Sequence, residues 1–272
     1  MLNNITLGQY YPVDSLVHRL DPRIKIVLTI VTLVAVFLVG TLAGYALILA
    51  FCLLVARLSN VPVRMLLKGI KPLRFILILT FFLNLFFTSG TELVHVGFVI
   101  ITREGLRQAI HFSLRLVFLV MTTSLMTLTT SPIQLSDGME MLFSPLKVIH
   151  FPAHELAMMM SIALRFIPTL MEETDKIMKA QKARGADFES GNLIQRAKSM
   201  IPLLVPLFVS AFRRAGDLAL AMESRCYHGG EHRTRLRVLR ITRMDYLACV
   251  AVAVLLALVI LESRFIPKGL IL

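Results

Sequence analysis

The sequence has few of the residues that hold soluble or secreted folds together. Its 272 residues include no tryptophan and three cysteines, and no two cysteines form a Cys-X-X-Cys pair. Neither a disulfide framework nor a zinc ribbon is therefore expected. Only 17% of the residues are charged and 56% are hydrophobic, with a mean hydropathy of +0.75. Soluble domains carry about 25% charged residues, so this composition predicts a membrane protein.

Acidic residues are absent from the middle of every long apolar run. A stand-alone ion-coupled carrier usually needs an intramembrane carboxylate, so this function is disfavoured and kept as an alternative. No Gly-X-X-X-X-Gly-Lys-Ser/Thr loop is present, and we expect no ATP binding by this chain. His150, His154 and Glu155 lack the His-Glu-X-X-His order of a zinc site, so we expect no metal. Candidates for catalysis are scattered, which leaves a membrane-embedded enzyme as the second alternative.

Apolar runs of membrane-spanning length predict five transmembrane helices. Ile24–Ala56 is uncharged over 33 residues, which is too long for one span of about 20 residues. Because Gly40 and Gly44 interrupt it, we expect two helices joined by a tight turn. Phe75–Phe87, Leu114–Leu128 and Tyr246–Leu261 supply three more spans. Four spans then lie within residues 1–130, and the fifth lies within residues 245–272.

Positive charge predicts the orientation of these spans. The chain has 29 Lys and Arg against 17 Asp and Glu, a net charge of +12. Arg57–Arg74 contains five basic residues and no acid, so it is expected to be a short cytoplasmic loop. This puts the N-terminus in the cytoplasm, Gly90–Gln108 outside and the C-terminus outside. The basic run Arg233–Arg243 directly precedes the last span, which favours contact with anionic lipid headgroups over nucleic acid.

Residues 131–244 are too long for a loop and still net basic, and their apolar residues recur at helical spacing. We expect three amphipathic helices at the cytoplasmic face, over Pro132–Ile149, about Ala153–Arg184 and about Leu193–Arg225. Prolines interrupt helical hydrogen bonding, so they should bend these helices or start new ones. The prolines concerned are Pro168, Pro202 and Pro206.

The second and third of these helices end alike, with an Ala four residues before an Arg: Ala180 before Arg184, and Ala221 before Arg225. An arginine there can simply complement the helix dipole, with Gly185 as a left-handed cap. Alternatively, each arginine is an anchor for an acidic groove on a partner. The repetition favours the anchor. Because Cys226 has a Cβ and resists positive φ, we expect the third helix to run on toward Tyr227 and to break at Gly229.

Three sequence elements together resemble the transmembrane T component (EcfT) of energy-coupling factor transporters. These are the two tips, the segment Arg165-Phe-Ile-Pro168, and an N-terminal element that runs from Gly8 to Ser15 and from His18 to Lys25. The first tip, Ala183-Arg184-Gly185, matches the family pattern fully, whereas Ser224-Arg225-Cys226 keeps only the arginine. Within the N-terminal element, Asp21-Pro22-Arg23 also has a simpler interpretation: a polar residue and Pro opening the first span, with Arg23 as an interface anchor.

The resemblance implies a non-catalytic subunit of an ABC-type importer for vitamins or other micronutrients in the bacterial cell membrane. Its coupling helices cross, and each tip docks into one of two partner ATPase subunits, which bind the ATP and Mg. A membrane substrate-binding S component, dedicated or one of several in exchange, sits on the same helices. The S component selects the substrate, so the substrate is not expected to be readable from this sequence.

Overall fold

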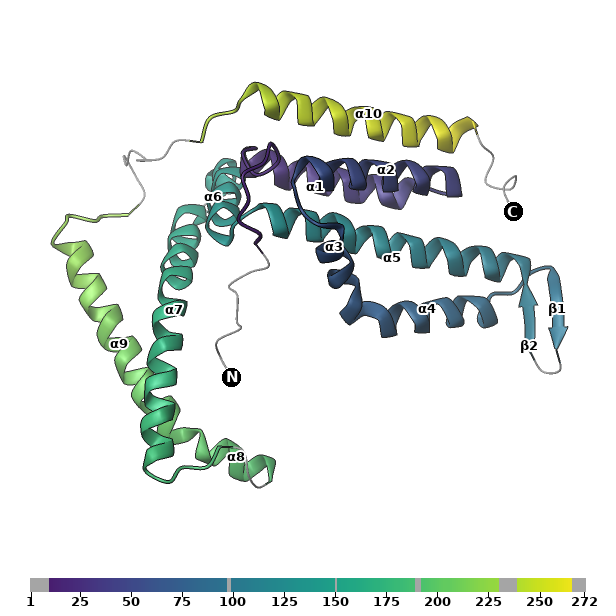
Figure 1. Ribbon diagram of the computed structural model, residues 1–272. Coiled ribbons are helices and arrows are strands. Elements are labelled where there is room, and N and C mark those ends of the chain that lie inside the picture. The colour runs from purple at the N-terminus through teal and green to yellow at the C-terminus, as the bar shows by residue number, and fades with distance from the viewer. Residues whose placement is uncertain (1–9, 97–98, 150, 189–191, 230–238, 266–272) are drawn as a thin grey trace. The chain divides into compact units, whose positions relative to one another are not determined.

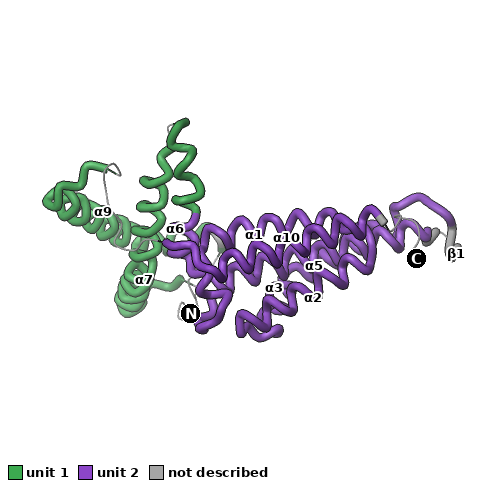
Figure 2. The backbone as a smooth tube through the Cα atoms, turned by 90° about the horizontal axis from the view of Figure 1, so that it is seen from above, with its two compact units in different colours: residues 1–6, 139–237 green, residues 7–138, 238–272 purple. Residues whose placement is uncertain are grey.

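The computed structural model describes residues 10–96, 99–149, 151–188, 192–229 and 239–265. The chain forms two compact units, coloured separately in Figure 2. Unit 1 is built on Met139–Arg237, and unit 2 combines Leu7–Gly138 with Val238–Leu272. The fold is α-helical as predicted, with the elements α1 (Pro22–Leu38), α2 (Leu42–Leu58), α3 (Val63–Ile70), the 3-10 turn η1 (Lys71–Leu73), α4 (Arg74–Phe87), β1 (Glu92–Val96), β2 (Val99–Thr102), α5 (Arg103–Thr129), α6 (Pro132–Phe143), the 3-10 turn η2 (Ser144–Ile149), α7 (Ala153–Ala183), α8 (Leu193–Ser199), α9 (Ile201–Glu223) and α10 (Arg243–Phe265).

Unit 2 is a bundle in which α1, α2, α4, α5 and α10 run lengthwise side by side (Figure 1). Its buried core includes Val36, Ile48, Cys52 and Val259. Tyr45 on α2 stacks on Phe118 of α5, with the ring centroids 5.8 Å apart. Large apolar side chains on the outer surfaces remain exposed, as expected where the surroundings are lipid.

Three helices in the described residues are long and apolar enough to cross a membrane: Val63–Phe87, Arg103–Thr129 and Arg243–Arg264. The helical hairpin predicted within Ile24–Ala56 is present as α1 and α2, each of 17 residues. Both fall slightly short of a full span by length. The count of five spans therefore remains a prediction, although the described residues contain all the helices that this count requires.

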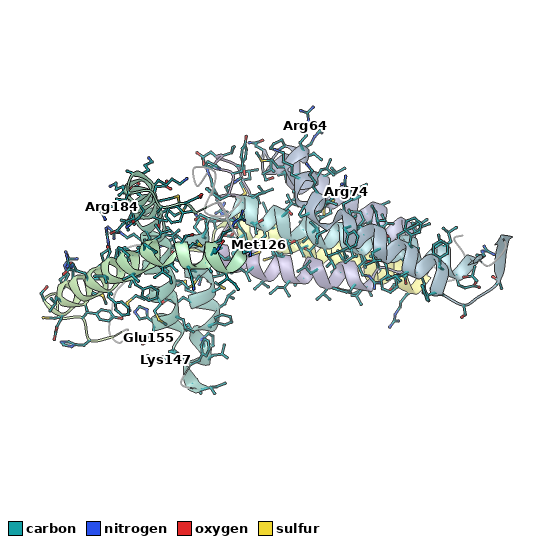
Figure 3. The ribbon with its side chains drawn as sticks, turned by 90° about the horizontal axis from the view of Figure 1, so that it is seen from below. Arg64, Arg74, Met126, Lys147, Glu155 and Arg184 are labelled. Carbon is teal, nitrogen blue, oxygen red and sulfur yellow. The ribbon has the colours of Figure 1, made fainter. Side chains whose placement is uncertain are left out.

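Two segments predicted to be loops are more ordered than expected. Most of Arg57–Arg74 is helical, because Leu66 is fully buried on one face of α3 while Arg64 and Lys68 stay exposed on others. Figure 3 shows the side chains of Arg64 and Arg74 extending from this part of unit 2. The predicted external segment Gly90–Gln108 contains an antiparallel hairpin of β1 and β2, followed directly by the start of α5. The hairpin is the one departure from an all-helical fold that the described residues show.

The predicted amphipathic helices are present. The first, Pro132–Ile149, is α6 continued by η2; its residues up to Gly138 belong to unit 2, and the rest, like the other two helices, belongs to unit 1. The second matches α7, and the third is divided at Met200 into α8 and α9, with Pro202 at the start of α9 as predicted. Pro168 and Pro206 lie inside helices that continue through them, so neither starts a new helix, and a bend at these two prolines stays a prediction.

Candidate docking site

The tips of α7 and α9 carry the same set of backbone hydrogen bonds. At the end of α7, the Gly185 amide donates to the Lys182 carbonyl at 3.0 Å, and the Ala186 amide to the Gln181 carbonyl at 3.0 Å. The equivalent bonds of α9 run from Cys226 to Glu223 at 2.9 Å and from Tyr227 to Met222 at 3.0 Å. Both sets form a Schellman motif, which satisfies the last helical carbonyls and turns the chain sharply.

Cys226 adopts a left-handed backbone conformation, with φ of +56° against +88° for Gly185. The expectation that the third helix runs on to Gly229 was therefore wrong, because α9 ends at Glu223. Left-handed backbone costs a residue with a Cβ about 1–2 kcal/mol. The two hydrogen bonds of the motif offset this cost, and they hold both tips in one geometry despite the different sequence.

Both arginines are exposed at these turns, as are their neighbours Ala183, Ser224 and Cys226. Figure 3 labels Arg184 among the exposed side chains of unit 1. Across the described residues, neither Arg184 nor Arg225 forms an ion pair. Their guanidinium groups are thus available to an external partner. A planar guanidinium donates several hydrogen bonds in a fixed geometry, which suits a carboxylate-lined groove.

A polar contact that was not predicted joins α7 to α9. Arg214 Nη2 lies 2.9 Å from Glu173 Oε2, and the Ser210 hydroxyl donates to the other oxygen of the same carboxylate. The hydrogen bond from Ser210, together with the charge of Arg214, lowers the pKa of Glu173 below its usual value. Ser210 and Arg214 are four residues apart and so share a helical face, which is the sequence signal that could have suggested a common partner.

Each arginine tip lies at the same distance along its helix from this contact. Arg184 follows Glu173 by eleven residues, and Arg225 follows Arg214 by the same number. At 1.5 Å per residue, each arginine lies roughly 16 Å along its helix from the ion pair. The two tips therefore have the same spacing from the ion pair on two non-identical helices.

An apolar face lies on α9, ahead of this ion pair in the sequence. Its residues recur at a helical spacing that places them together, and between 46% and 70% of each remains exposed: Leu204, Val205, Phe208, Val209 and Phe212. A soluble protein rarely leaves such a continuous apolar patch uncovered. The face is therefore suited to contact with lipid or with an apolar partner.

The N-terminal element shapes the start of α1 in unit 2. Asp21 accepts a hydrogen bond from the Arg23 amide at 2.9 Å, Pro22 occupies the first helical turn, and Arg23 Nη2 lies 2.8 Å from the Asp21 carboxylate. Burial opposes ionisation of Asp21, but the hydrogen bonds and charge of Arg23 hold its pKa below the usual value. The geometry is that of an N-cap with Pro at N1, which is the simpler of the two interpretations above.

Asp245 is a buried acceptor that sequence reasoning missed. It is fully buried, and its carboxylate accepts from the Asp21 amide at 2.8 Å and from the Thr242 amide and hydroxyl at 2.7 and 2.8 Å. The first residues of α1 and α10 are thereby tied together. Nothing in the local pattern distinguishes Asp245 from an ordinary acidic residue in the first turn of a helix, because its partner lies 224 residues away.

Several predicted residues take no part in these contacts. Arg165 and Pro168 are exposed on α7 and have no described partner. Of the basic run before the last span, Arg240 and Arg243 are exposed, whereas Arg233, Arg235 and Arg237 lie outside the described residues. The beginning of the N-terminal element, from Gly8 to Gln9, also lies outside them.

Comparisons with known proteins identify the family of this chain. A family model described as "Cobalt transport protein" matches residues 14–236. The energy-coupling factor transporter transmembrane protein EcfT of Thermosediminibacter oceani is 56% identical over 97% of this chain and 100% of its own length. The proteins of that name from Clostridium kluyveri and Bacillus subtilis are 52% and 51% identical, over 96% and 95% of this chain and 98% of each relative. The chain therefore belongs to the EcfT family of energy-coupling factor transporter membrane proteins.

Proposed function

We propose that this chain couples two partner ATPase subunits to a membrane S component that binds the substrate. The observation that carries the proposal is the pair of matched tips, each presenting one exposed arginine without an ion pair in the described residues. Two equivalent anchors suit two similar subunits. The names of the relatives support a transporter subunit, and this chain has no phosphate-binding loop, so ATP and Mg would be bound by the partners.

In this proposal the ATPase subunits move the tips, and α7 and α9 carry the movement to the S component. The Glu173–Arg214 ion pair keeps the two helices in register while their ends are displaced. The apolar face of α9 supplies a surface on which an S component could rest and shift, since apolar contacts are not directional. Vitamins or other micronutrients are the proposed class of substrate.

The orientation is part of the same proposal. ATP is hydrolysed in the cytoplasm, so both arginine tips and the N-terminus would lie inside, and the C-terminus outside. The exposed basic residues Arg64, Lys68 and Arg74 support this arrangement, because positively charged segments near the ends of spans are retained in the cytoplasm.

Co-purification with candidate ATPase subunits tests the anchors. A guanidinium anchor contributes about 2 kcal/mol, so Arg184→Ala or Arg225→Ala should weaken binding about thirtyfold, and the double variant should lose the complex. Arg213→Ala is a matched control, because Arg213 is exposed on α9 away from the tip. The anchor assignment is wrong if the double variant retains both wild-type complex and transport-linked ATP hydrolysis.

The apolar face requires a separate test. Phe208→Asn and Phe212→Asn should release a co-expressed S component while the ATPase subunits remain bound. Asp217→Asn places an asparagine on an exposed position of α9 outside the face and away from the tip, and it should release neither partner. Loss of the ATPases together with the S component would contradict the proposal that the face and the tips bind different partners.

A further inference from the structure

A cavity of about 350 Å³ lies within unit 2, between α1, α2, α5 and α10. It is far larger than a packing defect and within the range of small-molecule sites, which measure about 300–1,000 Å³. Its walls are almost entirely apolar. They include Leu28, Phe51, Val55, Met126, Ala248 and Val252. Met126 is labelled in Figure 3, close to the end of α5.

Three of the four threonines that line the cavity donate their hydroxyl hydrogen to a carbonyl of their own helix. Thr29 donates to the Lys25 carbonyl at 2.7 Å, Thr32 to the Leu28 carbonyl at 2.8 Å, and Thr129 to the Leu125 carbonyl at 2.8 Å. Thr122 is the fourth, and its buried hydroxyl has no hydrogen-bond partner among the described residues. Because water needs two to four polar partners, it is a poor occupant of such a space.

Lys25 is the one basic side chain among the described wall residues, which include no acidic one, and its ammonium group already donates two hydrogen bonds. It donates to the His18 carbonyl at 3.2 Å and to the Thr129 carbonyl at 3.0 Å, while only 6% of the residue is exposed. An occupant that brought its own charge deep into the cavity would have to displace these bonds. The interior is therefore suited to hydrocarbon.

Hydrocarbon can enter from the side, because residues at the edge of the cavity are exposed. Leu54 and Leu247 retain 54% and 64% exposure, and Leu58 and Met244 are also exposed. These residues belong to helices that carry the apolar outer surface of unit 2. An empty apolar space of this size would leave its lining without contacts on one side, so an acyl chain from the surrounding bilayer is favoured.

Charge at the same end of the bundle selects the kind of lipid. Arg57 precedes Leu58 in the last turn of α2, and Arg243 precedes Met244 at the start of α10. Both arginines are exposed and form no ion pair in the described part of the chain. The nearby carboxylates of Asp21 and Asp245 already accept hydrogen bonds from Arg23 and the backbone. We propose that this cavity binds one acyl chain of an anionic phospholipid, whose phosphate lies near Arg57 and Arg243.

Native mass spectrometry of the purified full-length chain tests the proposal, in micelles that contain equal amounts of phosphatidylglycerol and phosphatidylcholine. The wild type should retain one phosphatidylglycerol, at least threefold more often than phosphatidylcholine. Ala248→Phe fills the cavity and should lower the bound lipid at least tenfold. Ala253→Phe is the matched control, because Ala253 is exposed on the same helix and does not line the cavity. It should bind lipid like the wild type.

Further variants test where the bound acyl chain comes from and what the two arginines contribute. Combining Arg57→Gln with Arg243→Gln should abolish the preference for phosphatidylglycerol while an acyl lipid stays bound. Ala251→Phe, also in the wall, replaces Ala248→Phe if the latter loses its helical circular dichroism. The proposal is overturned if the wall variants bind as much lipid as the wild type. It is equally overturned if added palmitate binds in the cavity while neither phospholipid binds.

Discussion

Gly185 and Cys226 hold the same position in two copies of one helix-ending hydrogen-bond pattern. Both have positive φ, and the amide of each donates to a carbonyl three residues earlier at 3.0 or 2.9 Å. The arginine before each is exposed at the outside of the turn. The geometry of the tip is thus kept where the glycine is lost, which indicates that the hydrogen bonds of the motif, and not glycine itself, define the turn.

Two glycine substitutions should change stability in opposite directions. A Cβ added at Gly185 or Gly216 would have no neighbour within 4 Å, so neither change creates a clash. Gly185→Ala forces alanine into left-handed backbone and should cost about 1 kcal/mol. Gly216→Ala replaces glycine within α9 and should gain about 0.5–1 kcal/mol. The measurement is thermal unfolding followed by helical circular dichroism, and equal signs would contradict the backbone argument.

Reversing the charges of the contact between α7 and α9 should show whether it couples the helices. Glu173→Arg or Arg214→Glu alone sets like charges against each other, and each should reduce transport-linked ATP hydrolysis roughly threefold or more in the assembled complex. The double exchange restores opposite charges and should recover most of the activity. Glu172→Arg is the control, since Glu172 is exposed beside Glu173. No recovery in the double variant would show that attraction between these two groups is unimportant.

His18 should make stability depend on pH. Its Nε2 faces the Tyr11 carbonyl at 3.0 Å and must donate, so Nδ1 is left to accept from the Ser15 hydroxyl at 2.6 Å. Burial lowers the pKa of His18, which agrees with this neutral form. Its contribution is complete above about pH 6.5, the usual pKa, and is lost as the pH falls from there through the lowered value.

Unfolding temperatures between pH 7.5 and 5 measure this effect. The wild type should lose stability over this range, and His18→Gln should flatten the decline. His228→Gln alters an exposed histidine in unit 1 and should leave the decline unchanged. A decline that His18→Gln does not alter would assign the pH dependence to other groups.

Cysteine labelling of intact cells tests the orientation. Cys226 is exposed, whereas Cys52 is buried and Cys249 is partly buried. If the tips are cytoplasmic, a membrane-impermeant maleimide should not reach Cys226 until the membrane is opened. Ser89→Cys, made together with Cys226→Ser, introduces a thiol at an exposed position after α4 and should react in intact cells. The reverse pattern of labelling would invert the proposed topology.

Features governed by local sequence were largely predictable. The apolar runs, the hairpin near Gly40 and the end of α7 follow from hydropathy, glycine and helix capping, which act over a few residues. The amphipathic helix α3 was missed because its dense positive charge suggested a loop. Its burial of Leu66 becomes apparent only when the rest of the bundle is in place.

Features that depend on distant partners could not be predicted. Asp245 is bonded to the Asp21 amide, and Glu173 is paired with Arg214, over separations of 224 and 41 residues. At Cys226, side-chain preference argued against left-handed backbone, yet the hydrogen bonds of the helix end outweighed it. In each case, the contact that fixes the conformation is one that residue type alone does not specify.

The equal spacing of the two arginines from the Glu173–Arg214 ion pair has a mechanical consequence. The segments of α7 and α9 between the ion pair and the arginines have equal length. If the two tips are drawn together evenly, the helices rotate against each other about the ion pair. If two ATPase subunits approach each other evenly, the pivot stays in place and the helices change their angle. The movement would then reach the far ends of α7 and α9 as a rotation of one helix against the other.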